Sequence, residues 1–118
     1  MQYLLLIYDD EKKWAALSHA EVGKLIAEYN QFTDDIKASK HMLGGNRLQS
    51  VTTATTVRVR DGKPQMTDGP FAETREQLGG YMLIDVKDLD EALAVAARGA
   101  VARVGAVEVR PVREGPPQ

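Results

Sequence analysis

Two short stretches of this chain, residues 2–8 and 80–86, are apolar at consecutive positions and not only at alternate ones. Successive side chains of a strand point to opposite faces of its sheet, so Tyr3 and Leu5 would lie on one face and Leu4 on the other. Strands with this pattern are buried on both faces. The two stretches therefore predict a sheet that is covered on both sides.

Two helices are expected between the strands. Ser18 and Glu21 have the spacing of a capping box, and apolar residues then recur every three or four positions until the helix ends near residue 39 or 40. Asp88 is placed to cap a second helix, and Gly99 stands where the C-terminal cap of that helix would lie. Between the first strand and the first helix we expect a loop, residues 9–17, anchored by Trp14.

The remaining strands are shorter or more polar. Gly44 and Gly45 interrupt an otherwise strand-like stretch and indicate a bulge or the close approach of another backbone. Asp61-Gly62 is a hairpin signal between two alternating stretches, which we interpret as a projecting arm. The stretches that complete the prediction are residues 42–48, 55–60, 63–67 and 104–112.

This order of elements predicts an α+β, ferredoxin-like βαββαβ fold with an inserted β-hairpin. Residues 1–112 would form a single domain, followed by a flexible tail, residues 113–118. Two helices can cover only one face of such a sheet, whereas the apolar strands call for two covered faces. We therefore expect a homodimer in which a second copy covers the other face, forming a dimeric α+β barrel.

Composition excludes several classes of function. The 118 residues carry a net charge of −2 with acids and bases interspersed, so no basic face indicates nucleic acid or an anionic membrane. The absence of cysteine excludes disulfides, thiolate zinc sites and cysteine nucleophiles. The apolar N-terminal stretch is too short for a membrane helix and lacks the features of a signal peptide. We expect a cytoplasmic protein without a metal or another cofactor.

The segment of residues 66–81 is the least generic part of the sequence, because Asp68-Gly69-Pro70 is a turn signal that precedes a group of charged residues. Asp68 is the candidate catalytic residue. In an apolar setting its pKa would rise and it could act as a general acid or base. The alternative is that the Asp68 carboxylate accepts backbone hydrogen bonds and only shapes the turn.

Five further residues are candidates for substrate binding. Arg47 follows the glycine pair and could hold an anionic group, although it could equally be a surface arginine. Tyr8 and Tyr81 offer hydroxyl groups near strand ends, with aromatic packing as the alternative. Glu73 and Glu76 could line a polar pocket mouth, or form part of a solvated charge cluster.

The segments that begin the chain, form the hairpin, carry the turn and form the second helix together resemble the YCII-related (YciI-like) family, in its DGPF-motif subgroup. The resemblance extends from Met1 to about residue 112, and its central motif is Asp68-Gly69-Pro70-Phe71. The matching segments read MQYLLLIYDDEKKW, TTVRVRDGK, TDGPFAETREQLGGY and LIDVKDLDEALAVAAR. The resemblance implies a dimeric α+β barrel of ferredoxin-like subunits.

What the resemblance implies about function is an enzymatic role, proposed for the wider family from a His/Asp pair in a pocket and from similarity to muconolactone isomerase. His19 and His41 stand in no motif that aligns with that pair, so neither is carried over. DGPF members are also associated with extracytoplasmic-function sigma factors. Three hypotheses follow: cofactor-independent acid/base chemistry on a small organic molecule, a non-catalytic ligand-binding or regulatory module linked to a sigma factor, or a structural dimer whose turn seals the interface.

Overall fold

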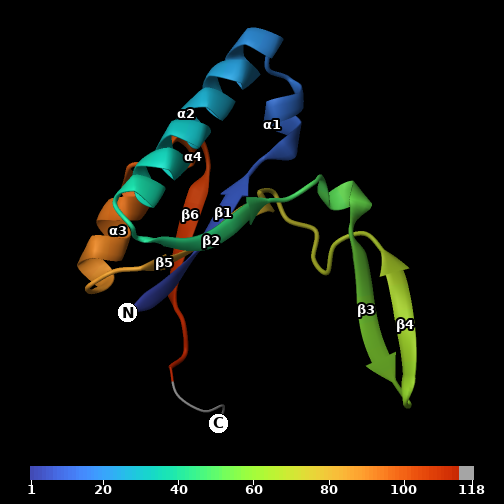
Figure 1. Cartoon of the computed structure of the whole chain (residues 1–118). Coiled ribbons are helices and arrows are strands. Elements are labelled where there is room, and N and C mark those ends of the chain that lie inside the picture. Colours follow the sequence, from blue (N-terminus) through green and yellow to red (C-terminus); the bar gives the residue numbers. More distant parts are fainter. Residues whose placement is uncertain (115–118) are drawn as a thin grey trace.

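The computed structural model of the protein describes residues 1–114 and contains a sheet covered by helices and a separate two-stranded arm (Figure 1). A 3₁₀ turn, Val51–Thr53, precedes the arm. The elements are β1 (Gln2–Asp9), α1 (Glu11–Ala15), α2 (His19–Ala38), β2 (Met42–Arg47), β3 (Thr55–Arg60), β4 (Lys63–Asp68), β5 (Gln77–Asp85), α3 (Leu89–Ala97), α4 (Ala100–Val104) and β6 (Ala106–Pro111).

The main sheet has the strand order β2-β5-β1-β6, and all of its neighbouring strands are antiparallel. The helices α2, α3 and α4 lie on one face of it (Figure 1). This α+β arrangement is consistent with the ferredoxin-like fold predicted from the sequence. The strands β3 and β4, which lie between β2 and β5 in the chain, pair only with each other and point away from the sheet (Figure 1).

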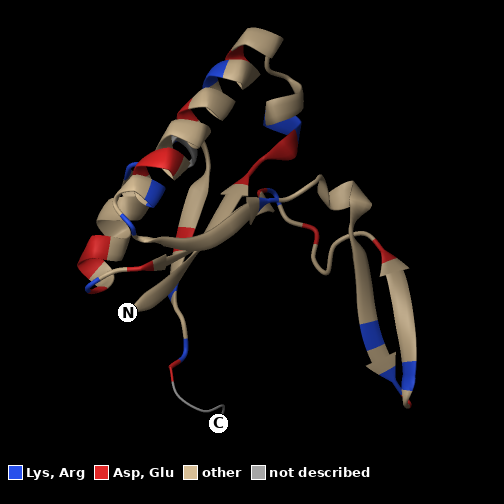
Figure 2. Cartoon of the chain, viewed as in Figure 1, with Lys and Arg blue, Asp and Glu red and all other residues tan. Residues whose placement is uncertain are grey.

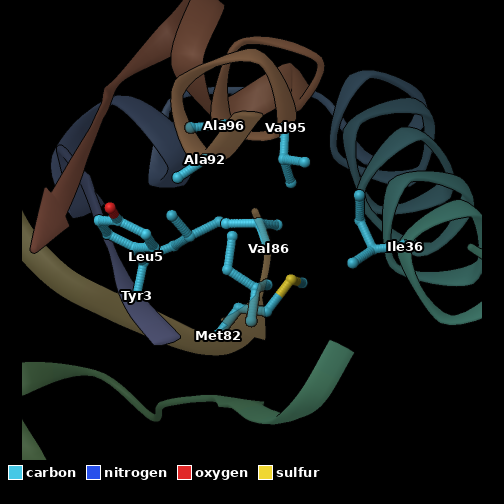
Figure 3. Packing of buried hydrophobic residues seen from close by; sticks show 9 residues of the cluster. Tyr3, Leu5, Ile36, Met82, Val86, Ala92, Val95 and Ala96 are labelled. Atoms are coloured by element: carbon cyan, nitrogen blue, oxygen red, sulfur yellow. The ribbon is translucent and has the colours of Figure 1, made fainter. Parts of the chain in front are cut away.

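The core lies between the sheet and the helices, as Figure 3 shows for the cluster around Leu5 and Ile36. Full burial of a side chain such as leucine or isoleucine stabilises the fold by about 1.5–3 kcal/mol. The buried residues of this cluster are Tyr3, Leu5, Ile36, Met82, Ile84, Val86, Ala92, Val95 and Ala96.

The other face of the sheet carries no helix (Figure 1). Leu4 and Leu83 are direct neighbours on β1 and β5, and with Leu6 they form an apolar centre on this open face. All three are half-buried, whereas Leu5 and Met82 on the helix side are almost fully buried. Residues 1–114 of a single chain therefore do not cover this second face, and the homodimer that would cover it stays a prediction.

The expected loop of residues 9–17 contains a helix, which corrects that part of the prediction. The Asp10 carboxylate accepts a hydrogen bond from the Lys12 backbone N–H at 2.9 Å, and α1 begins there. Asp-Asp at the end of a strand predicts a turn, but the second aspartate here is a helix N-cap. Trp14, the predicted anchor of the loop, lies on this short helix and is half-buried.

Two predicted boundaries near the C-terminal half are also wrong. Gly99 does follow the cap residue Arg98, but the chain continues into α4 instead of a strand. Val104 therefore ends a helix, and the last strand begins at Ala106. The strand predicted from residue 80 begins three residues earlier, because Gln77 already pairs with the end of β1.

Several local predictions are confirmed. Ser18 and Glu21 form a reciprocal capping box, and α2 ends before its cap residue Ser39. Asp88 caps α3 by accepting from the Glu91 backbone N–H at 3.0 Å. A Cβ at Gly45 would lie 2.6 Å from the carbonyl oxygen of Tyr81, so this position needs glycine for close backbone approach.

The arm has the hairpin that the sequence predicts. Asp61 and Gly62 both have positive φ, at 52° and 73°, which is the geometry of a type I′ turn. The returning strand β4 includes Asp68, which pairs with Thr55, so Asp68 ends a strand and the positive φ of 102° falls on Gly69. Lysine and arginine gather at the far end of the arm (Figure 2).

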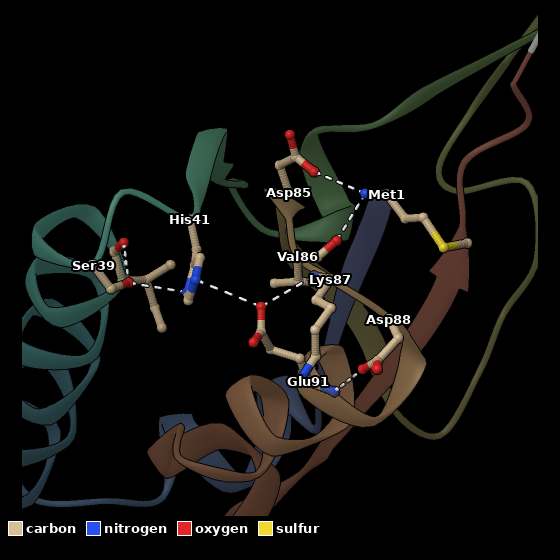
Figure 4. A network of polar contacts seen from close by, with 9 residues as sticks. Met1, Ser39, His41, Asp85, Val86, Lys87, Asp88 and Glu91 are labelled. Carbon is tan, nitrogen blue, oxygen red and sulfur yellow. Dashed lines mark hydrogen bonds and ion pairs between the residues drawn. The ribbon is translucent and has the colours of Figure 1, made fainter.

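At the end of the sheet away from the arm, polar contacts join the helices to the strands (Figure 4). The His41 Nε2 atom lies 3.6 Å from a carboxylate oxygen of Glu91, and its Nδ1 atom lies 3.1 Å from the Ser39 hydroxyl. His41 thus has a partner that is distant in sequence.

Among the described residues, every helix is too short or too polar to span a membrane.

Candidate functional site

A cavity of about 230 Å³ opens on the helix-covered side of the sheet, where β1 ends. Its walls come from β1, the short helix α1, the middle of α2, the segment that follows β2, and the start of β5. The residues that line it are Ile7, Asp9, Glu11, Trp14, Leu25, Ile26, Tyr29, Arg47, Leu48, Gln49, Ser50, Gly79, Gly80 and Val104.

A β-bulge places Asp9 at the edge of this cavity. Ile7 pairs with Gly80 and Tyr8 pairs with Leu78, so Gly79 is the extra residue on β5. A Cβ at Gly79 would lie 3.1 Å from the Asp9 Oδ1 atom. The Asp9 carboxylate therefore rests against a residue that has no side chain, and the bulge leaves the space that it occupies.

Gly80 opens the adjoining part of the cavity floor. It pairs with Arg47 on β2, and a Cβ there would lie 3.5 Å from the Arg47 Cα and 3.8 Å from the Tyr29 hydroxyl. The paired glycines thus leave room for Arg47 on one side, Asp9 on the other and Tyr29 above them. The site is built on three strands and a long helix, which are rigid elements.

The carboxyl group of Asp9 has a perturbed pKa. Burial raises the pKa of Asp9 above its ordinary value of 3.8, because the half-buried carboxylate loses part of its hydration. A hydrogen-bonding interaction with Trp14 opposes this shift, the charge of Glu11 adds to it, and Arg47 opposes it. Asp9 in the folded protein therefore keeps its proton to a higher pH than an aspartate in water does.

Arg47 is positioned by Tyr29. Its guanidinium carbon lies 5.5 Å from the centre of the Tyr29 ring, within the range of a cation–π interaction. Burial raises the pKa of Tyr29 and the Arg47 charge opposes that rise, so this phenol stays neutral at neutral pH. None of the ion pairs among residues 1–114 involves Arg47. Its charge is directed at the cavity and available to a ligand.

Glu11 holds α1, and therefore Trp14, against the opposite wall. Its carboxylate accepts hydrogen bonds from the Ser50 hydroxyl at 2.6 Å and from the Val51 backbone N–H at 3.1 Å. Its own backbone N–H donates to the Gln77 side chain at 3.0 Å. One glutamate thus joins the segment after β1 to the segment after β2 across the mouth of the cavity.

The segment of residues 66–81 reaches this site through Gln77. The Gln77 amide nitrogen donates to the carbonyl oxygens of Thr74 at 2.6 Å and Arg75 at 3.4 Å, while its oxygen accepts from Glu11. The charged part of that segment is thereby tied to the cavity mouth. Glu76 is close enough for its charge to raise the pKa of Asp9.

The structure divides the residues predicted from sequence into separate groups. Arg47 lines the cavity and Glu76 acts on Asp9. Asp68 and Glu73 are exposed, Asp68 at the base of the arm and Glu73 in the segment that follows it.

The two tyrosines lie elsewhere. Tyr8 and Tyr81 belong to the open face of the sheet, and the Tyr81 hydroxyl accepts a hydrogen bond from the Asn46 amide at 2.9 Å. Leu6 lies directly opposite Tyr81 on the same face. The cavity and the open face are therefore separate surfaces, on opposite sides of the sheet.

Three residues of the cavity were missed as functional candidates. Asp9 falls at the start of the predicted loop, Glu11 falls within that loop, and Tyr29 falls in the apolar stripe of the predicted helix. The sequence does contain a signal for Asp9. An acidic residue that continues the core-facing side of a buried strand must lie at the edge of the core. Contacts such as that of Glu11 with Ser50, 39 residues away, have no local signal.

The described residues contain no group of three or more histidine, cysteine, aspartate or glutamate side chains placed to hold a metal ion. The polar groups of the cavity include a carboxyl with a raised pKa, an arginine that takes part in none of the ion pairs among residues 1–114, and a neutral phenol.

Comparisons with known proteins agree on one family. The family model of the YCII-related domain matches residues 1–115. An uncharacterised protein of Rhizobium meliloti (strain 1021) is 37% identical over 114 residues, which cover 95% of this chain and 92% of that protein. The chain belongs to the YCII-related domain family.

Proposed function

We propose that this YCII-related protein binds a small organic molecule with an anionic group and performs cofactor-independent acid/base chemistry on it. The observation that carries the proposal is the Asp9 carboxyl, whose pKa is raised, beside an Arg47 without an ion pair in one cavity of about 230 Å³. Perturbed carboxyl groups in clefts are typical of sites of proton transfer.

Arg47 would hold the anionic group. A guanidinium presents paired N–H donors that match a carboxylate in a bidentate arrangement, and the Tyr29 ring lies within cation–π distance of the Arg47 guanidinium. A bound carboxylate would place its neighbouring atoms over Gly79 and Gly80, between Arg47 and Asp9. The absence of side chains at both glycines provides that space.

Asp9 would transfer the proton. A carboxyl with a raised pKa is a stronger base when ionised than an ordinary aspartate, and it retains a proton to a higher pH. The proton would pass from an atom of the ligand to the Asp9 carboxylate and return to the ligand at another atom, so no oxidant or second substrate is required. Trp14 would orient the carboxylate, since its indole N–H can only donate.

This proposal gives Asp9 the role that the sequence suggested for Asp68. Asp68 would instead shape the base of the arm, where it pairs with Thr55. The open face would be covered by a second copy of the chain, because the half-buried Leu4, Leu6 and Leu83 form an apolar centre there. Sedimentation equilibrium at micromolar concentration tests this dimer, and a monomer would contradict it.

Binding can be measured directly, because Trp14 is the single tryptophan of the chain and lines the cavity. Its fluorescence should respond to sodium acetate or benzoate and not to benzamide, the neutral analogue. Arg47→Gln should weaken benzoate binding at least tenfold, because it removes the bidentate charge. Arg60→Gln, at the tip of the arm, is the matched control and should bind normally. An unchanged response in Arg47→Gln would contradict the site.

Catalysis is tested separately. Incubation with pyruvate in deuterated water, followed by proton NMR, measures whether the protein accelerates exchange of the methyl protons next to the carbonyl. Asp9→Asn should abolish such exchange while Asp34→Asn, a substitution at an exposed helix position, should retain it. Carboxylate binding without any exchange would favour the second hypothesis, a non-catalytic ligand-binding module.

A further inference from the structure

A second cavity, of about 420 Å³, adjoins the first. Four residues, Trp14 among them, line both cavities, so the two spaces are adjacent. These shared residues are Asp9, Trp14, Leu25 and Val104. The second cavity is further lined by Asp10, Lys13, Leu17, Glu21, Lys24, Glu28 and Arg103.

Apart from Asp9, the acidic groups of the second cavity are already engaged within the protein. The Glu28 carboxylate accepts from the Arg103 guanidinium at 2.7 Å. Glu21 completes the capping box of α2, and Asp10 caps α1. None of these three carboxylates needs a ligand to satisfy it. A molecule that enters the second cavity therefore meets engaged charges together with apolar side chains.

The apolar surface comes from Trp14, Leu17, Leu25 and Val104. Lys13 and Lys24 add their aliphatic stems while their ammonium groups can reach solvent. The first cavity differs, because it is also lined by Arg47, which forms none of the ion pairs among residues 1–114. The first cavity is therefore suited to a charged group, and the apolar part of the second cavity to hydrocarbon.

We propose that the two cavities form one bipartite site for a carboxylic acid with an apolar chain. The carboxylate lies at Arg47 and the aliphatic or aryl chain passes Trp14 into the second cavity. This inference rests on the proposed function, because it takes the anion site at Arg47 as its starting point. It adds the substrate class: an acid with a hydrophobic tail, in place of a small acid filling only the first cavity.

Trp14 is suited to this intermediate position. The short helix that carries it is fixed by the Asp10 cap and by the contacts of Glu11 with Ser50 and Val51. Its indole presents a flat apolar surface at which a chain or ring can lie. A ligand that spans both cavities would contact this side chain along its length.

The test is a chain-length series. Acetate, butyrate, hexanoate, octanoate and 4-phenylbutyrate are titrated into the full-length protein by isothermal calorimetry, with the Trp14 fluorescence as a second readout. Affinity should rise roughly threefold to fourfold for each methylene that enters the second cavity. Acetate should compete with octanoate, because both would occupy Arg47.

Leu17 lines only the second cavity, and it separates the two parts of the site. Leu17→Gln should reduce octanoate affinity at least fivefold and leave acetate affinity unchanged, while Leu17→Met should retain both. Leu43→Gln is the matched control, since Leu43 is exposed on β2 and lines neither cavity.

The possible outcomes are distinct. Equal affinity for acetate and octanoate would overturn the bipartite site and leave the proposed function standing. If none of the carboxylates binds, the proposed function fails and the bipartite site fails with it. Tighter binding of hexylamine than of hexanoate would overturn the inference in another way, because the carboxylates of the second cavity would then select a cation.

Discussion

The four-stranded sheet and the β3–β4 arm contain strands of similar length but differ in what they bury. In the sheet, Tyr3, Leu5 and Met82 are no more than 2% exposed. In the arm, Val57 and Val59 alternate with polar residues as a half-buried strand would, yet they are 58% and 61% exposed. Strands thus form in both regions, but their apolar side chains are buried in only one of them.

The arm also changes the shape of the chain. The radius of gyration is 16.3 Å, compared with about 13.5 Å for a compact domain of this length. The two ends of the arm are joined to each other at its base, where the Gly69 N–H donates to the Ala54 carbonyl at 2.8 Å and the Thr56 hydroxyl donates to the Gly69 carbonyl at 2.9 Å. A two-stranded hairpin is marginally stable by itself. The fold should therefore depend on the sheet and scarcely on the arm.

The largest difference in stability is expected from a valine-to-alanine substitution made once in the core next to the sheet and once in the arm. Val86→Ala, where the side chain is 5% exposed, should lower the free energy of unfolding by about 2 kcal/mol through lost burial and a residual cavity. Val59→Ala should change it by no more than about 0.5 kcal/mol. Urea denaturation measures both.

An equal loss for the two valine variants would break the comparison. It would show that the exposed side of the arm is covered in solution by another molecule, and a dependence of that loss on protein concentration would identify a second copy.

A smaller effect is expected at the mouth of the cavity. Glu11→Gln keeps the shape of the side chain but removes the charge that strengthens its bonds to Ser50 and Val51. The expected loss is about 1 kcal/mol, because hydrogen bonds to charged groups are stronger than neutral ones and this one is partly exposed. Amide hydrogen exchange should quicken at Val51. Unchanged exchange there would mean that the contact does not hold the segment.

The third prediction concerns Asp9 and depends on pH. Since burial raises the Asp9 pKa above 3.8, the folded protein holds more protons than the unfolded chain between 3.8 and the raised value. Stability therefore falls as the pH rises through that window. Asp9→Asn has no charge to lose, so its melting temperature should exceed that of the wild type by about 1–2 °C at pH 7. The difference should vanish below about pH 3.8.

Asp68→Asn provides the counterpart of this test in the arm. Asp68 is exposed, and its substitution should not shift the melting temperature at pH 7. A gain for Asp68→Asn with none for Asp9→Asn, by differential scanning calorimetry, would reverse the assignment of the buried carboxyl.

The smallest effect is expected within the arm. The Arg58 guanidinium carbon lies 5.0 Å from the centre of the Phe71 ring, which is itself 75% exposed. A double-mutant cycle of Arg58→Gln and Phe71→Leu should give a coupling of about 0.5 kcal/mol, as for exposed cation–π pairs. A coupling above about 2 kcal/mol would indicate that the pair is shielded from water.

The fold was largely predictable because its signals are local. The capping box of Ser18 and Glu21, the Asp88 cap and the Asp61-Gly62 turn each depend on residues within a few positions of one another. The short helices were not predictable in this way. The five residues of α1 are too few for a hydrophobic period, and α4 continues the helical structure past a glycine that commonly ends it.

The candidate site was less predictable because it is assembled from distant parts of the chain. Arg47 is a candidate for anion binding from its sequence, but no local pattern connects it with Gly79 and Gly80. What joins them is the register of β2, β5 and β1, which sets Arg47 beside Gly80 and leaves Gly79 as a bulge against Asp9. That register arises from pairing across the sheet, whereas the turn motif around Asp68 is visible within a few consecutive residues.

The narrow attachment of the arm has a practical consequence for protein engineering. Its two ends meet at Ala54 and Gly69, whose backbones are joined by the 2.8 Å hydrogen bond. A loop whose ends already touch can be shortened to a tight turn, or exchanged for a peptide tag or a small foreign domain, at little cost in loop-closure entropy. The chain therefore offers a site for replacement at the base of the arm, whose strands contribute to neither the main sheet nor the cavity.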